Sequence, residues 1–270
     1  VCCTWFTAID NQKYVAVAIG KVIYVASPET VVQKLSLHAA MITCIEYLPQ
    51  HDCILSADQA GALDLWDCRG SLVASDENVE EQAFGTTTLQ VGGPLCGSAR
   101  HHIQYSSKTE TDLYLLQRKT TYAGAIAVTR THYAIYAADH KLRLFEHASG
   151  NCVVTYGEGI DAYEAIYTKY DIDSMEFGKR AATEREIRQE SNVFQSRGQR
   201  FILQFDDSGR YLLIPSLLGI KVLDTKRHKL VGVVGKADAG SLRFVCCALA
   251  SGAAVVDTQM LLARGGATTS

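Results

Sequence analysis

Four residues whose side chains could take part in chemistry lie close together near the start of the sequence: His38, Ser56, Asp58 and Trp66. A serine, a histidine and an aspartate can form a catalytic group in which the histidine activates the serine hydroxyl. The same side chains can instead form a buried hydrogen-bond chain, because imidazole donates and accepts, indole donates, and aspartate accepts backbone amides. We favour the second interpretation, a structural tetrad, since the four positions fit a repeating strand pattern.

Two further groups of residues have types used in ligand binding. The pair His101–His102 could bind a metal, but no Cys, Asp or Glu lies nearby at a ligand spacing. The glycines Gly92, Gly93 and Gly97 lack the lysine and the strand-to-helix setting of a phosphate-binding loop. We therefore predict no catalytic, cofactor-binding or metal-binding residue in this chain.

A charged stretch, "DSMEFGKRAATEREIRQES", predicts a helix within residues 158–198, because it is rich in helix formers and poor in β-branched residues. Asp173 and Glu176 have the spacing of a capping box. Glu176 with Arg180, and Glu184 with Arg188, lie four residues apart and can form ion pairs along the helix surface.

This helix is a candidate docking element for a partner, and it could equally pack against its own chain. Phe177 and Ile187 are apolar positions on an otherwise polar helix, and we favour packing of these two side chains against the chain itself. The residues that we assign to the candidate partner-docking surface are Met175, Glu176, Phe177, Arg180, Glu184 and Arg185.

Short strand-like segments that recur along the chain must position these residues. The segments "VIYVA", "LDLWD", "LRLFE" and "IKVLD" begin at Val22, Leu63, Leu142 and Ile220, first about 40 and then about 80 residues apart. The last three each follow an apolar strand and a tight turn and precede another strand, which is typical of an antiparallel meander. A period near 40 residues with four strands per unit is typical of propeller blades.

The sequence thus predicts an all-β fold, part of a WD40-type β-propeller with four to five blades and one charged helical insertion. The blades are expected near residues 1–37, 38–75, 111–157, 199–236 and, in part, 241–270, with an irregular insertion over 76–110 and the helical insertion over 158–198. Because an incomplete ring exposes sheet faces and edges, we expect the chain to be a piece of a longer protein.

Composition excludes several classes of function. The net charge is −3, which predicts no general attraction to nucleic acid or to an acidic membrane. No apolar run approaches the ~20 residues of a membrane helix. The nine cysteines are odd in number and contain no CxxC pair, which favours free thiols over disulfides or a metal site.

The tetrad spacing resembles the WD-repeat pattern, and residues 111–250 resemble one family more closely. The segments "TDLYLL", "LRLFEHASGNCVVTYGE", "MEFGKRAATERE", "FDDSGRYLLIPSLLGIKVLDT" and "VGVVGK" are similar to the WD-repeat region of the peptidylprolyl isomerase domain and WD repeat-containing proteins. These are cyclophilin-type peptidyl-prolyl cis-trans isomerases with an amino-terminal propeller. Of these segments, "MEFGKRAATERE" is the most specific.

The resemblance implies a nuclear protein-interaction scaffold, bound to spliceosomal proteins and acting in protein folding and pre-mRNA splicing. It implies no cofactor, no membrane and no direct sequence-specific contact with nucleic acid. The Phe-His-Arg and Gln-Gly-Gly-Asp motifs of the cyclophilin domain do not occur in this chain, so we assign no catalytic residue from the family. The alternative is a WD-repeat adaptor or substrate receptor unrelated to cyclophilins.

Overall fold

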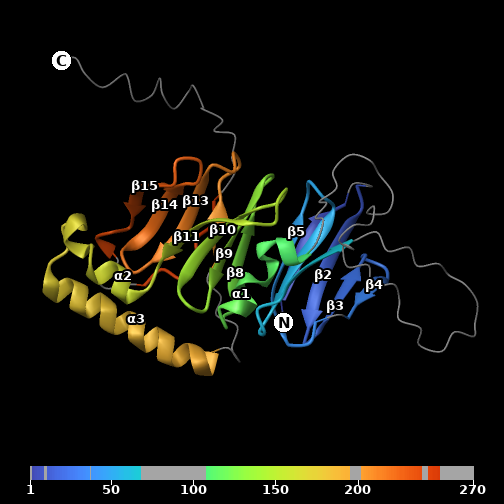
Figure 1. Cartoon of the computed structure of the whole chain (residues 1–270), viewed down its shortest axis with the longest axis horizontal. Helices are drawn as coiled ribbons and strands as arrows, with labels where there is room; N and C mark the ends of the chain where they lie inside the picture. The colour runs from blue at the N-terminus through green and yellow to red at the C-terminus, as the bar shows by residue number, and fades with distance from the viewer. Residues whose placement is uncertain are drawn as a thin grey trace, which may run out of the picture.

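The computed structural model describes residues 2–8, 11–36, 38–67, 108–194, 202–238 and 243–249. Within these ranges most of the regular structure is β-strand, arranged as four antiparallel sheets that follow one another along the chain (Figure 1). The predicted all-β class is therefore confirmed, together with the charged helix between the third and fourth sheets.

Each sheet is a meander in which strands that are consecutive in sequence pair with one another. Sheet I contains β1 (Cys2–Thr7), β2 (Lys13–Ile19), β3 (Val22–Ala26) and β4 (Val31–Leu35). Sheet II contains β5 (Ile42–Leu48), β6 (Cys53–Asp58) and β7 (Leu63–Asp67). Sheet III contains β8 (Ala123–Val128), β9 (His132–Ala137), β10 (Lys141–Glu146) and β11 (Cys152–Gly157). Sheet IV contains β12 (Gln204–Phe205), β13 (Tyr211–Ser216), β14 (Gly219–Asp224) and β15 (Lys229–Val234).

The recurring segments occupy the same place in every sheet. "VIYVA", "LDLWD", "LRLFE" and "IKVLD" lie in β3, β7, β10 and β14, each the third strand of its meander. The strands predicted before and after them are found in sheets III and IV. The strand predicted after β7, at Ser71–Ser75, lies outside the described residues.

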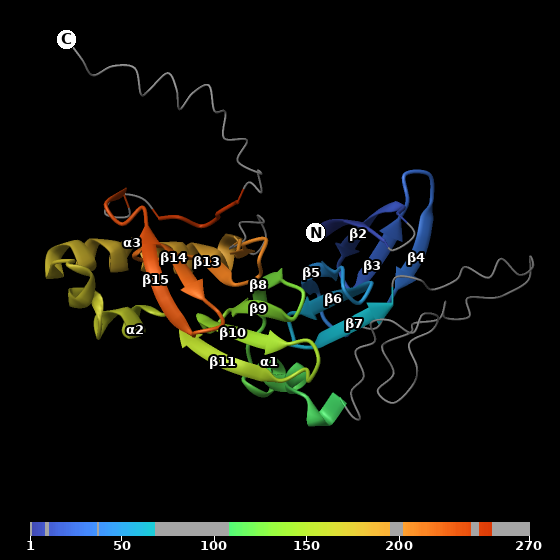
Figure 2. The same ribbon diagram turned by 90° about the horizontal axis from the view of Figure 1, so that it is seen from above.

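Adjacent sheets contact each other through their first strands. Strand β5 lies against β1 on one side and β8 on the other, and β8 also contacts β12. Sheets I and IV stand at opposite ends of the array (Figures 1 and 2). Apolar side chains fill the space between successive sheets, so each inner sheet is covered on both faces.

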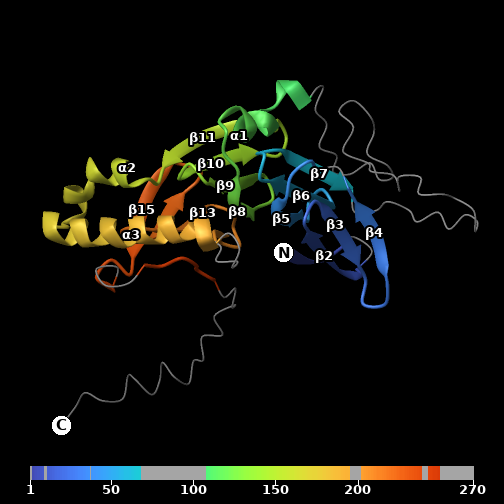
Figure 3. The same cartoon turned by 90° about the horizontal axis from the view of Figure 1, so that it is seen from below.

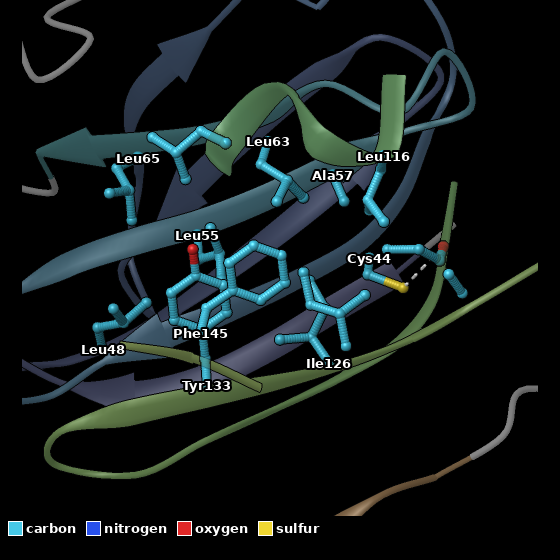
Figure 4. Close-up of a cluster of buried hydrophobic side chains, with 14 of the residues drawn as sticks. Cys44, Leu48, Leu55, Ala57, Leu63, Leu65, Leu116, Ile126, Tyr133 and Phe145 are labelled. Atoms are coloured by element: carbon cyan, nitrogen blue, oxygen red, sulfur yellow. Dashed lines mark hydrogen bonds between the residues drawn. The ribbon is translucent and has the colours of Figure 1, made fainter. Parts of the chain in front are cut away.

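Burial along the strands reflects this arrangement. All six residues of β6 are buried, because sheets I and III cover both faces of sheet II, whereas β2 of sheet I alternates between buried and more exposed positions. The cluster between sheets II and III includes Leu55 and Ile126, together with the parallel, stacked rings of Tyr133 and Phe145, whose centroids are 5.0 Å apart (Figure 4).

Two groups of helices accompany the sheets. The first precedes sheet III and consists of η1 (Lys108–Glu110), η2 (Asp112–Tyr114) and α1 (Leu115–Arg118), so residues 112–118 of the predicted third blade are helical. The second consists of α2 (Ile160–Glu164), η3 (Tyr167–Tyr170) and α3 (Ser174–Phe194), and it lies beside sheet IV (Figures 1 and 3). No helix among the described residues is long and apolar enough to span a bilayer.

The start of the predicted fifth blade forms no strand over its described residues, 243–249. This segment runs beside the start of sheet IV, where the amide of Ile202 donates to the carbonyl of Val245 at 3.2 Å. The rest of the segment predicted for that blade lies outside the described residues.

Candidate functional site

The four residues proposed as a tetrad are joined by hydrogen bonds at sheet II. Nδ1 of His38 lies 3.1 Å from Oδ2 of Asp58, and Nε2 of the same ring lies 2.6 Å from Oγ of Ser56. The indole Nε1 of Trp66 donates to that serine oxygen at 2.5 Å. One hydroxyl therefore links the histidine, from the segment before the sheet, to the third strand.

The local structure explains how Asp58 is held in place. It ends β6, and its Oδ1 accepts the backbone amides of Ala60 and Ala62 in the following turn, both at 2.9 Å. Gly61 in this turn has a positive φ of 84°, and a Cβ there would lie 2.4 Å from the carbonyl oxygen of Thr121. Only glycine fits at that position, because both the backbone conformation and the close approach exclude a side chain.

Burial decides between the two chemical interpretations of the Ser-His-Asp set. Ser56 and Trp66 are fully buried, Asp58 is 1% exposed, and the side chain of His38 is 0% exposed. A serine nucleophile must reach a substrate carbonyl beside donors for the developing oxyanion. The hydroxyl of Ser56 is enclosed between the sheets and already bonded to two side chains and to the carbonyl of Asp64, so it stabilises one strand register rather than attacking a substrate.

A lysine that the sequence interpretation missed extends this network. Lys108, from η1, forms an ion pair with Asp64 of β7, and Oδ2 of Asp64 lies 3.8 Å from Nδ1 of His38. The following helical segment then contributes Leu113 and Leu116 to the core between sheets II and III. The only sequence signal for this contact is the charge of Asp64 between two buried leucines of an apolar strand.

In sheets III and IV, an arginine–aspartate pair connects the third strand to a nearby turn. In sheet III, Arg143 of β10 binds Asp139 of the preceding turn at 2.9 and 2.5 Å. In sheet IV, Arg210 binds Asp224 of β14 at 3.0 and 2.7 Å. Burial raises the pKa of Asp139, but the hydrogen bonds and charge of Arg143 outweigh it and leave that pKa below its ordinary value. The hydrogen bonds from Arg210 likewise lower the pKa of Asp224.

The start of α3 shows the Asp173 half of the predicted capping box. Oδ1 of Asp173 accepts the backbone amide of Glu176 at 2.7 Å, which satisfies one of the free amides of the first turn. The carboxylate of Glu176 forms an ion pair with Arg180, as its spacing predicts. Glu184 pairs with Arg243 at 2.6 Å, and the side chain of Arg188, its predicted partner, lies outside the described residues.

The residues assigned to the partner-docking surface divide into two groups. Phe177, Arg180 and Glu184 are buried against this chain: Phe177 stacks on Tyr167 at 4.4 Å, and Arg180 donates to the carbonyl of Leu218 at 3.3 Å. The side chains of Met175 and Arg185 are exposed, and that of Glu176 is partly exposed. The described part of α3 thus uses its apolar side, including Phe177, to dock on sheet IV.

A buried polar group fixes the start of this helical insertion to sheet IV. Glu158, just after β11, accepts a hydrogen bond from the hydroxyl of Tyr163 in α2. It also forms an ion pair with Lys221 of β14, whose Nζ lies 2.5 Å from Oε1 of Glu158. Burial, followed by the negative charge of Glu158, raises the pKa of Tyr163 well above its ordinary value. The phenol therefore stays protonated and donates, which is a structural role.

Two histidine rings meet where the turn after β5 approaches the end of β10. The ring centroids of His51 and His147 are 5.2 Å apart, and Nε2 of His147 lies 3.1 Å from the carbonyl oxygen of Thr129. Burial, and then the neighbouring His51, lower the pKa of His147 to about 4. His147 is therefore neutral at physiological pH.

Within the described ranges, no group of three or more His, Cys, Asp or Glu residues is placed to hold a metal ion. The residues weighed as metal or phosphate ligands, His101, His102, Gly92, Gly93 and Gly97, all lie outside the described residues. The seven cysteines that the structure describes are free thiols.

No protein-family model matches the chain. It is 25% identical over 225 residues to the peptidyl-prolyl cis-trans isomerase cyp15 of Rhizopus delemar, covering 80% of this chain and 30% of that protein. It is 25% identical over 222 residues to human peptidylprolyl isomerase domain and WD repeat-containing protein 1, covering 81% of this chain and 29% of that protein. Peptidyl-prolyl cis-trans isomerase 9 of Schizosaccharomyces pombe is 27% identical over 215 residues, 75% of this chain and 30% of that protein.

The matched region is thus about 30% of the length of these curated relatives. By sequence, the chain is similar to proteins named as peptidyl-prolyl isomerases, one of which is also named for WD repeats.

Proposed function

We propose that this chain is part of a WD-repeat β-propeller in a cyclophilin-type peptidyl-prolyl isomerase, and that it serves as a protein-binding scaffold. Four meanders in series, with the recurring segment always in the third strand, support the propeller architecture. The similarity to isomerases, including one named for WD repeats, supports the kind of protein to which the propeller belongs.

The observation that carries this proposal is the buried state of the Ser56–His38–Asp58 set within one of these sheets. The residues that could have formed a hydrolytic site stabilise the sheet instead, which favours a binding role for this part of the chain. Isomerase activity, which accelerates a step that takes tens of seconds unaided, is assigned in this proposal to a separate domain of the complete protein.

The isomerase assignment is tested by a proline-isomerisation assay on a peptide with an X-Pro bond. We expect the complete protein to accelerate the exchange and residues 1–270 alone to leave the rate at its uncatalysed value. Turnover by residues 1–270 would overturn the assignment of this chain as a non-catalytic scaffold.

By the family resemblance, the proposed partners are spliceosomal proteins and the proposed compartment is the nucleus. The complete protein, tagged and purified from nuclear extract, should retain spliceosomal proteins at physiological salt, and its fluorescent fusion should accumulate in the nucleus. A complete protein that lacks a cyclophilin domain and co-purifies with other complexes would instead favour the unrelated WD-repeat adaptor.

A further inference from the structure

We propose that the β14–β15 turn and its neighbours form a docking surface for an acidic protein segment. The turn and the first residue of β15 carry four consecutive basic-type residues, Lys226, Arg227, His228 and Lys229, and all four are exposed. Within the described ranges, none of the three full cations among them forms an ion pair. This inference rests on the proposed scaffold function and specifies the chemistry of one partner.

Hydrogen bonds to a buried aspartate hold the backbone of the β14–β15 turn in one conformation. Asp224 is buried and its Oδ1 accepts the amides of Lys226 and Arg227 at 3.0 and 3.1 Å. Its other oxygen binds Arg210, which satisfies the aspartate's charge without using the exposed cations. His228 has a positive φ of 52°, and its Nδ1 lies 3.1 Å from the hydroxyl of Tyr156. A turn fixed in this way loses little conformational entropy when it binds a partner.

Neighbouring turns extend the surface. The carbonyl of Arg210 accepts from Thr225, which ties the β12–β13 turn to the β14–β15 turn. A Cβ at Gly209 in the β12–β13 turn would lie 3.1 Å from Cβ of Thr129, so the β8–β9 turn is also in contact. That third turn contributes Arg130, which is exposed. All three turns lie at the strand ends opposite the β13–β14 turn on which α3 docks.

Carboxylates on these turns are mostly used internally. Asp206 accepts hydrogen bonds from the amide of Tyr211 at 2.7 Å and from the hydroxyl of Ser208 at 2.5 Å. Burial by itself would raise the pKa of Asp206, but the hydrogen bonds outweigh burial and leave that pKa below its ordinary value. Glu146 ends β10, next to the β8–β9 turn, and accepts from Ser149 at 2.8 Å. Asp207 is the exposed carboxylate among these residues. The surface therefore presents four cations, Lys226, Arg227, Lys229 and Arg130, against one exposed carboxylate.

The aromatic residues of this surface favour a protein partner over a single-stranded nucleic acid. Binding of single strands relies on aromatic faces on which bases stack. Here the ring of Tyr211 lies under the guanidinium of Arg210 at 5.1 Å, and the ring of Tyr156 is half-buried. Cations without a stacking platform match the carboxylates of an extended acidic segment.

The test measures binding of the complete protein to three fluorescent probes of equal length: an eight-residue Asp/Glu peptide, a Gln peptide and an oligouridine RNA. The binding variant is Lys226→Glu/Arg227→Glu/Lys229→Glu, and the matched control is Lys13→Glu/Lys21→Glu/Lys34→Glu, which makes the same charge change at three exposed positions of sheet I. Circular dichroism verifies that both variants remain folded.

We expect the acidic peptide to bind more tightly than the other two probes, with affinity falling as salt is raised. The turn variant should weaken it about tenfold or more, because three exposed charge contacts are lost and replaced by repulsion, and the control variant should change it less than about threefold.

Equal losses in both variants, no binding of the acidic peptide, or tighter binding of the RNA through the same residues would overturn the proposal. If one of these results is found while the turn variant still retains spliceosomal proteins from nuclear extract, this surface is ruled out as a docking site and the proposed scaffold function stands.

Discussion

Sheets II and III have the same strand order but stabilise the third strand with different chemistry. In sheet II the indole of Trp66 needs an acceptor, and the hydroxyl oxygen of Ser56 supplies it. The same hydroxyl is hydrogen-bonded to His38. In sheet III the matching position of the recurring segment is Phe145, which needs no acceptor and stacks on Tyr133. There the polar contact is the ion pair between Arg143 of the third strand and Asp139 of the preceding turn.

The difference teaches that the repeated unit is specified by its strand pattern, while its internal polar contacts can vary. In sheet II two side chains, His38 and Trp66, depend on the hydroxyl of Ser56, so a single change leaves two buried groups without that partner. In sheet III the ion pair has two members, and the exposed fraction of Asp139 is 27%, so water can replace a lost partner. We therefore expect sheet II to be the more sensitive of the two.

The largest effect is expected for Trp66→Ala. The side chain is fully buried between sheets I and II, and its loss creates a cavity and removes the bond to Ser56. The free energy of unfolding, measured by chemical denaturation, should fall by ~3–5 kcal/mol. Trp5→Ala is the matched control, because Trp5 is 75% exposed, and it should cost less than about 1 kcal/mol. Equal losses for the two variants would contradict the structural role of Trp66.

Ser56→Ala should have the next largest effect. It leaves two neutral groups, the indole of Trp66 and Nε2 of His38, without their shared partner in a buried site, which costs about 1–2 kcal/mol for each group and ~2–4 kcal/mol in total. Thr183→Ala, at an exposed position of α3, serves as the control and should be nearly neutral.

The same serine tests the catalytic alternative. A fluorophosphonate probe, which labels activated serines, should not modify Ser56 in the native protein. Labelling that disappears in Ser56→Ala would show an accessible nucleophile and refute the structural interpretation of the tetrad.

Acid should weaken the contact between sheets II and III through His147. Its pKa is lowered to about 4 in the folded protein, so between pH 4 and about 6.5 the unfolded chain binds more protons than the folded one. Stability must therefore fall as the pH falls through this range, with about 2 kcal/mol lost between pH 7 and pH 5. His147→Gln should remove that part of the pH dependence, and an unchanged pH profile in the variant would contradict this assignment.

The smallest effect is expected for Arg143→Met. The change removes a buried charge and retains an apolar side chain, while Asp139 remains partly accessible to water. Removing one member of an ion pair is costly when the charge left behind is buried, but here that charge is on Asp139, which water can solvate. We therefore expect a loss of about 1 kcal/mol or less in chemical denaturation. A loss as large as that of Ser56→Ala would show that the two sheets are braced equally strongly.

Much of the fold could be predicted from local patterns. The four recurring segments, their flanking strands and the capped start of α3 depend on alternation, turn residues and side-chain spacing within a few residues. The helical turns at 112–118 were not predicted, since Leu113 and Leu116 fit an apolar strand as well as they fit a short buried helix.

The sequence by itself determined the order of the strands, their third-strand repeat and the types of residue in the tetrad, because these depend on neighbours along the chain. Only the tertiary structure decided that Ser56 is enclosed, that Lys108 reaches Asp64, that Glu184 binds Arg243 and that Lys221 binds Glu158. These outcomes depend on which segments pack together across long separations, and charge alone does not specify a partner among the many residues of opposite sign in the chain.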